Sequence, residues 1–269
     1  MNELTFSNSW RILQYDAPTA LEQMAVDEQL AKEAQPTLRL FRWSRPALSL
    51  GFKQPMPAWM EREKLASHGV ELVERPTAGG IAIHGSDLSC SVVVPHETGV
   101  TLRTLMQSVC ETLANAVHAC NVECQWRCDV RASHRIDYCL TEESPYAIMV
   151  GGATPVSSWH HPLPLRGATS RISVNAGTSL RGERKLCGLA LRRYPASWLV
   201  QGSLLMRPLP TVFARVMPRE IVEAFQTRAI SLEEATGRPI LDDELTTRIM
   251  EIWQTPYVGM ESLSYGVTV

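Results

Sequence analysis

The sequence predicts an α+β fold, in which helices pack on a mixed sheet. Three observations support this class. A near-continuous apolar strand is expected over residues 88–95. Two further strands, 186–192 and 198–205, flank a turn at Pro195 and are expected to pair. From Pro218 onward the apolar residues recur with helical spacing, so the chain is expected to end in a helical tail.

The 269 residues correspond to one or two domains at ~150 residues per domain. The natural boundary lies at the Pro-rich stretch near 208–211. We therefore expect a mixed-sheet body over residues 1–210 and a small helical segment over 211–269. Within the body, 151–181 is rich in Gly, Pro, Ser and His over its first half and is expected to be an insertion.

The first helix has the clearest local signals. Residues 2–15 are expected to be extended, and 19–33 to be helical, because Leu21, Met24 and Leu30 roughly follow helical spacing. Thr19 with Glu22 three residues later is the capping-box pattern. The helix is therefore expected to begin at Thr19.

The remaining elements follow from shorter patterns. A helix over 102–120 is expected to bury the face that carries Leu105, Val109, Leu113, Ala116 and Val117. The other expected strands are 38–43, 47–51, 70–74, 80–84, 146–150 and 172–174, and the other helices are 59–68, 219–225, 232–236 and 242–253.

Composition excludes several classes of protein. The net charge is −2, which disfavours a protein that binds nucleic acid by bulk charge. No apolar stretch approaches the ~20 residues that span a bilayer, and the first residues lack the pattern of a signal peptide. Seven cysteines, an odd number, are simplest to explain as reduced thiols. We therefore expect a cytoplasmic protein with no membrane and no nucleic-acid partner.

A metal site is not expected. Cys120, Cys124 and Cys128, with His118 nearby, are spaced like one face of a helix and lack the short spacing typical of structural zinc sites. Buried cysteines at a helix end are the better interpretation.

The segment 74–84 is a candidate binding loop. Ala78, Gly79 and Gly80 lie between two short strands, where small residues let backbone N–H groups approach a ligand closely. Arg75 is a candidate for holding an anion, and His84 for donating a hydrogen bond or capping a strand. A plain turn would explain the glycines about equally well.

Lys185 stands at the start of the strand that follows a charged turn. A lysine there is either an edge-strand charge that opposes aggregation or a fixed cation aimed at a developing oxyanion.

Taken together, these segments resemble the lipoate–protein ligase and octanoyltransferase family, which has the biotin/lipoate ligase catalytic fold. The order and spacing of the matches, from Leu21 to Ile252, make the resemblance fairly specific. The matching stretches are Met24–Glu28, Leu48–Gln54, Arg75–His84 with the following Cys90-Ser-Val-Val, Lys185–Arg193, Gln201–Ser203 and Ala229–Pro239. Of these, Leu48–Gln54 is closer to the octanoyltransferase version than to the ligase version.

Cys139 indicates the branch of the family. Cysteine-dependent octanoyltransferases of this fold carry a Cys, a Ser five residues later and a Tyr seven residues later, and Cys139, Ser144 and Tyr146 keep that spacing. The ligases lack this cysteine because ATP activates their acid. Alternatively, Cys139 is simply one of seven cysteines.

The resemblance implies an acyltransferase with catalytic Cys139 and Lys185. Cys139 would carry the octanoyl or lipoyl group as a thioester, and Lys185 would hold the carbonyl oxygen as it gains charge. The donor would be acyl carrier protein or an acylated lipoyl-type protein, and the acceptor a lysine of a lipoyl domain. No cofactor or metal is needed on this route. The implied substrate-binding residues are Arg75, Thr77, Ala78, Gly79, Gly80, His84, Gly188, Ala190 and Gly202.

Two other interpretations stay open. An ATP-dependent lipoate–protein ligase would use the 75–84 loop and Lys185 for phosphate, with Mg²⁺. A non-catalytic module that binds acyl or lipoyl domains gains support from three departures. Glu74 stands where the family usually has Arg, Ala78 replaces a Gly, and Gln201 stands where octanoyltransferases tend to have His.

Overall fold

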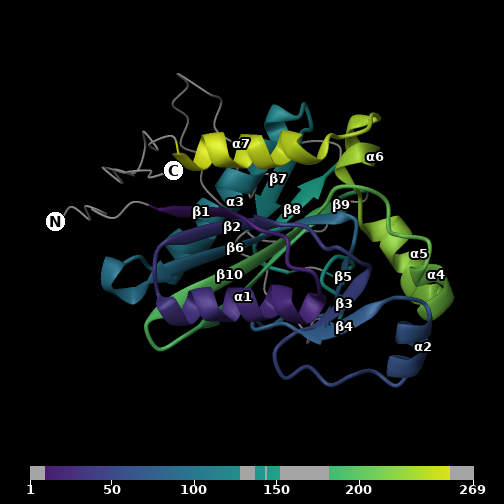
Figure 1. Ribbon diagram of the computed structural model, residues 1–269. Coiled ribbons are helices and arrows are strands. Elements are labelled where there is room, and N and C mark those ends of the chain that lie inside the picture. Colours follow the sequence, from purple (N-terminus) through teal and green to yellow (C-terminus); the bar gives the residue numbers. More distant parts are fainter. Residues whose placement is uncertain (1–9, 128–136, 143, 152–181, 255–269) are drawn as a thin grey trace.

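The computed structural model describes residues 10–127, 137–142, 144–151 and 182–254 (Figure 1). Its centre is a seven-stranded sheet with the order β1-β2-β6-β10-β9-β8-β7. Only β1 and β2 are parallel, so the sheet is mixed, as predicted. The strands are β1 Arg11–Gln14, β2 Thr37–Phe41, β6 Asp87–Pro95, β7 Cys124–Arg127, β8 Ala147–Val150, β9 Arg184–Arg193 and β10 Ser197–Leu205.

A second sheet of three strands lies beside the first in the order β4-β3-β5. It consists of β3 (Ala47–Leu50), β4 (Glu71–Glu74) and β5 (Ala82–His84). The strands on either side of the turn at Pro46, β2 and β3, therefore belong to different sheets. The segment that joins β4 to β5 crosses the end of β3, and this crossing places the candidate binding loop at the edge of both sheets.

Helices cover both faces of the large sheet (Figure 1). One face is covered by α3 (Leu102–Ala119) and α7 (Asp242–Gln254), and the other by α1 (Ala20–Glu33) together with the small sheet. The shorter helices are α2 Arg62–Ser67, α4 Phe213–Val216, α5 Arg219–Arg228 and α6 Leu232–Thr236, with a 3₁₀ turn at His96–Thr98.

The local signals predicted α1 and α3 correctly. The Thr19 hydroxyl accepts from the Glu22 backbone N–H at 3.2 Å, and the Glu22 carboxylate accepts from the Thr19 N–H at 3.1 Å. The predicted apolar face of α3 is buried throughout. The expected pairing of β9 with β10 is confirmed as well.

The core behind the large sheet extends into the C-terminal helices. Leu245 and Ile249 of α7 are buried in the same apolar cluster as Val109 and Leu113 of α3. Trp253 packs edge-on against Trp10, with ring centroids 4.9 Å apart. The segment predicted to be a separate tail therefore shares its apolar core with the sheet.

Some expectations lie outside the described residues: most of the predicted insertion, the strand over 172–174, and Cys128. Among the described residues, no helix is long and apolar enough to cross a membrane.

Candidate active site

A cavity lies between the large sheet and the three-stranded sheet. Met24 of α1 and Trp43, which follows β2, line it together with residues of both sheets. Of the residues predicted from the sequence, the cavity is lined by Arg75, His84, Cys139, Gly188, Ala190 and Gly202. These residues come from five separate stretches of the chain.

Small residues on β9 and β10 make room for this cavity. Strand residues alternate between faces, so Gly188 and Ala190 share one face of β9, and Gln201 and Ser203 share the same face of β10. Gly202 faces the other way. A Cβ on Gly202 would lie 2.7 Å from the Cys90 sulfur and would point toward α3, so Gly202 borders the cavity only with its backbone.

The Cys139 thiol lies directly over Gly188. A Cβ on Gly188 would come within 2.7 Å of Cys139 Sγ, so the sulfur occupies the space that any larger residue would need. Cys139 is partly exposed, whereas the other described cysteines are buried. The cavity therefore contains one accessible thiol among the described residues.

Backbone hydrogen bonds tie the Cys139 segment to the binding loop. The Ile81 N–H donates to Asp137 O at 2.7 Å, and the Cys139 N–H donates to Ile81 O at 2.9 Å. Gly80 is needed at this contact, because a Cβ there would lie 2.6 Å from the Asp137 backbone.

Lys185 lies behind Cys139 and is 2% exposed. Its ammonium group donates to Cys139 O at 2.5 Å, to Ser144 Oγ at 2.6 Å and to Glu142 O at 3.1 Å. All three of these acceptors belong to the segment 139–144. In this arrangement Lys185 holds the ends of the cysteine segment together.

Arg75 organises the binding loop from inside. Nη1 donates to Ser49 O at 3.1 Å and to Ser49 Oγ at 3.2 Å, and Nη2 donates to Ala78 O at 3.0 Å and to Gly80 O at 2.7 Å. Burial lowers the pKa of Arg75, and the neighbouring Cys139 acts in the opposite direction. The Arg75 guanidinium thus fixes the conformation of the loop, because it binds the carbonyl groups of Ala78 and Gly80 at the same time.

The loop residues differ in exposure. Thr77 and Gly80 are buried, whereas Ala78 and Gly79 are exposed. None of these four predicted binding residues lines the cavity. Gly79 has a φ of +107°, which residues with a side chain rarely adopt. Glu74 is also exposed.

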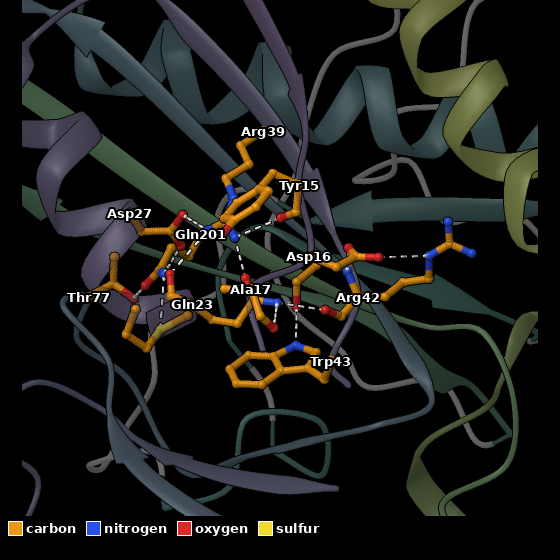
Figure 2. A network of polar contacts seen from close by, with 12 residues as sticks. Tyr15, Asp16, Ala17, Gln23, Asp27, Arg39, Arg42, Trp43, Thr77 and Gln201 are labelled. Carbon is orange, nitrogen blue, oxygen red and sulfur yellow. Dashed lines mark hydrogen bonds and ion pairs between the residues drawn. The ribbon is translucent and has the colours of Figure 1, made fainter. Parts of the chain in front are cut away.

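A buried polar network anchors the loop to α1 (Figure 2). Gln201 accepts from Thr77 Oγ1 at 2.6 Å and donates to Asp27 Oδ2 at 2.6 Å. Asp27 also pairs with Arg39 at 2.7 Å, and both of those side chains are fully buried. Burial raises the pKa of Asp27 even though Arg39 opposes the shift. Gln201 is therefore the link between the loop and this ion pair.

His84 and Trp43 lie side by side in the cavity lining. The two rings stack with centroids 3.9 Å apart. His84 Nδ1 lies 2.8 Å from Asp87 Oδ2, and Nε2 lies 2.8 Å from Ser49 Oγ. Asp87 also accepts from the hydroxyls of Ser89 and Ser203.

Sequence reasoning missed Ser49, Asp87 and Trp43. One local signal was available, because His84 and Asp87 are three residues apart and a turn brings such residues together. Ser49 carried no such signal, since its partner lies 35 residues away on the neighbouring strand.

The described residues contain no group of three His, Cys, Asp or Glu side chains placed to hold a metal. Cys120 and Cys124 are buried, as expected, and burial raises the pKa of Cys124 to about 12.

Known proteins resemble this chain over most of its length. It is 26% identical over 253 residues to octanoyltransferase LipM of Symbiobacterium thermophilum, covering 86% of this chain and 80% of the relative. It is 25% identical over 264 residues to octanoyltransferase LipM of Kyrpidia tusciae, covering 90% and 85%.

The fold matches solved structures as well. A bi-partite lipoate protein ligase from Thermoplasma acidophilum superposes with a TM-score of 0.64 at 16% identity, covering 91% of this chain and 82% of that one. The family model described as the lipoyl protein ligase A/B catalytic domain matches residues 14–254. This chain therefore belongs to the lipoyl protein ligase A/B catalytic domain family.

Proposed function

We propose that this protein transfers an octanoyl group from a thioester donor to a lysine of a lipoyl domain, through a thioester on Cys139. One observation carries the proposal: a partly exposed thiol lies over Gly188 in the cavity, within a segment held by Lys185. The relatives named octanoyltransferase support the same reaction class.

In the first half-reaction, the Cys139 thiolate attacks the carbonyl carbon of the donor thioester. The new carbon–sulfur bond forms at Cys139, the bond to the donor sulfur breaks, and the donor leaves as a thiol after it gains a proton. In the second, the neutral amine of the acceptor lysine attacks the Cys139 thioester. The amide carbon–nitrogen bond forms, the carbon–sulfur bond to Cys139 breaks, and the departing thiolate takes up the proton that the amine loses, which regenerates the thiol. Covalent catalysis thus divides one difficult transfer into two easier ones.

Lys185 supports this chemistry from behind the sulfur. Its bonds to Cys139 O and Ser144 Oγ fix both ends of the nucleophile segment. A fixed cation beside the reaction centre also stabilises the negative charge that develops on the carbonyl oxygen. For direct contact with that oxygen, the ammonium would have to give up one of its present acceptors.

In this proposal the acyl chain enters the cavity. The lining includes the apolar Met24, Phe41 and Trp43 and the small Gly188 and Ala190. Each CH₂ buried against such side chains contributes ~0.8 kcal/mol. The donor in this proposal is octanoyl acyl carrier protein, whose thioester already holds the activation that ATP supplies to a ligase.

The decisive test is the intact mass of the protein after mixing with octanoyl carrier protein. We expect one octanoyl increment, removed by hydroxylamine, and none on Cys139→Ser. Cys120→Ser, which removes a buried thiol distant from the cavity lining, is the control and should still acquire the adduct. Acylation of Cys139→Ser would refute the assignment of the nucleophile.

A second assay separates the transferase from a ligase. Lipoyl-domain modification is measured once with octanoyl carrier protein alone and once with free lipoate, ATP and Mg²⁺. We expect product in the first tube. Product in the second tube alone would establish the ligase, and domain binding with no product in either would establish a binding module.

A further inference from the structure

The cavity contains a second chemical arrangement, formed by Ser49, His84 and Asp87. Their side chains connect in the order hydroxyl, imidazole, carboxylate, at 2.8 Å for each step. This is the order and spacing found in Ser-His-Asp catalytic triads. Neither the proposed transfer reaction nor the cysteine segment uses these three groups directly.

The Asp87 carboxylate fixes the direction of the hydrogen bond between Asp87 and His84. Burial disfavours the ionised form of Asp87, but His84 and the hydroxyls of Ser203 and Ser89 outweigh it and hold its pKa below the usual value. Ionised Asp87 can only accept, so the proton of His84 is assigned to Nδ1. On the other side of the ring, His84 Nε2 lies 2.8 Å from the Ser49 hydroxyl, whose oxygen also accepts from Arg75 at 3.2 Å.

Ser49 is poorly placed to be a nucleophile. It lies in β3, the central strand of the three-stranded sheet, and its side chain is 0% exposed. Its hydroxyl already bonds to His84 and receives a bond from Arg75. The accessible thiol of Cys139 lines the same cavity, so the arrangement does not need to supply a second nucleophile.

The hydrogen bonds that start at Asp87 lead instead, through Ser49 and Arg75, toward the Cys139 segment. Arg75 bonds to Ser49 on one side and to Gly80 O on the other, at 2.7 Å. The next residue, Ile81, holds the Cys139 segment through its N–H and its carbonyl. A series of hydrogen bonds, continued through the backbone of Gly80 and Ile81, therefore joins Asp87 to the backbone of Cys139.

Resting on the proposed function, we propose that Asp87, His84 and Ser49 form a positioning relay. The relay orients the Arg75 guanidinium, and Arg75 in turn sets the 78–80 loop and the Cys139 thiol. Both Arg75 and Cys139 line the cavity, so a displaced guanidinium also moves a positive charge relative to the sulfur.

The test is the rate at which iodoacetamide alkylates Cys139 at pH 7, followed by peptide mass spectrometry. Alkylation needs no acyl donor, so it reports on the relay even if the octanoyl reaction fails. We expect Ser49→Ala to slow alkylation about tenfold, because a displaced Arg75 no longer holds the loop against which the Cys139 segment is positioned. In octanoyl transfer, kcat of the same variant should also fall about tenfold, whereas its KM for the donor should stay within about twofold of the parental value.

Ser197→Ala is the matched control. Ser197 is also 0% exposed and also loses a strong hydrogen bond, 2.6 Å to Ala31 O, but it does not line the cavity. In the Ser197→Ala variant, Cys139 should be alkylated at the parental rate. His84→Asn tests the middle of the relay. The shorter Asn amide can still bond to Asp87 in place of Nδ1, but it does not reach Ser49, which loses its imidazole partner. It should behave like Ser49→Ala.

Two results would overturn the proposal. One is parental alkylation in folded Ser49→Ala and His84→Asn, as judged by circular dichroism. The other is labelling of Ser49 in the parental protein by a fluorophosphonate, which would make Ser49 a nucleophile in its own right.

Discussion

The residues around the thiol are held by very specific contacts. Lys185 uses three acceptors that all belong to the cysteine segment, and Gly188 leaves no free space between its own backbone and Cys139 Sγ. Enzymes lose much of their rate when a reacting group moves by about 1 Å. Single substitutions here are therefore expected to affect turnover more than folding.

Lys185→Ala is predicted to lower the rate of octanoyl transfer by about 10²–10³-fold, the effect of losing one positioned donor. Lys185→Arg should not restore it, because a planar guanidinium cannot make the three bonds of a compact ammonium in a site that is 2% exposed. Single-turnover acylation measures both variants. A near-parental rate in Lys185→Ala would show that Lys185 has no role in the transfer reaction and acts only as a charged residue of the strand.

Gly188→Ala is predicted to abolish most reactivity of Cys139 while β9 remains paired. The added methyl would lie 2.7 Å from the sulfur, well inside contact distance, so the thiol must move away. The measurement is alkylation of Cys139 by iodoacetamide, with circular dichroism to check the fold. Alkylation at the parental rate would show that the sulfur has free space that this structure does not contain.

At the scale of elements, a buried ion pair joins α1 to β2. Asp27 and Arg39 are both 0% exposed, and Gln201 extends the contact to the binding loop (Figure 2). Two charges without water are stable only when both are paired. This pair therefore fixes α1 against the sheet from which the cavity is built.

Arg39→Met is predicted to destabilise the fold by about 3–5 kcal/mol, because it leaves Asp27 buried without its cation. The control is Arg238→Met, which breaks the surface pair with Glu244 and should cost much less, because solvent screens that pair. Urea unfolding of both variants measures the difference. Equal losses would contradict the buried pair as the main contact between these elements.

A pH effect is predicted at the β5–β6 turn. The pKa of Asp87 lies below its ordinary value of 3.8, since His84 and two hydroxyls outweigh the effect of burial. Its contribution to stability is present above pH ~4 and is lost as the pH falls through the folded pKa. In urea unfolding, the difference in unfolding free energy between the parental protein and Asp87→Asn should therefore narrow as the pH falls below about 4. A gap that does not change with pH would contradict the prediction.

At the scale of the molecule, one core connects the sheet to the C-terminal helices. Leu245 of α7 is fully buried in the apolar cluster that also contains residues of α3. The helices α3 and α7 lie side by side on the sheet (Figure 1). A shared core predicts cooperative unfolding, whereas a division near residue 210 predicts two separate units.

Leu245→Ala is predicted to cost about 2–5 kcal/mol and to shift a single unfolding transition. The cavity that it creates lies in the common core, so sheet and helices should lose structure together. Calorimetry and near-UV circular dichroism of the tryptophans measure this. Two separated transitions would support the boundary predicted from the sequence.

Local patterns in the sequence determined most of the elements. The capping box at Thr19, the apolar face of α3 and the strand around Val92 depend on residues within one or two turns of each other, and all three are present in the structure. The family motifs also located Arg75, His84, Cys139 and Gly188, which meet in one cavity.

The tertiary structure alone decided how those residues are connected. Lys185 meets Cys139 across 46 residues, Thr77 meets Gln201 across 124, and Ser49 meets His84 through the pairing of β3 with β5. Such contacts depend on strand register, and a slip of one residue would turn every side chain to the opposite face. Periodicity is a local property and carries no information about register between distant strands. For that reason the sequence determined the elements and the candidate residues, while the relay behind Arg75 emerged only from the folded chain.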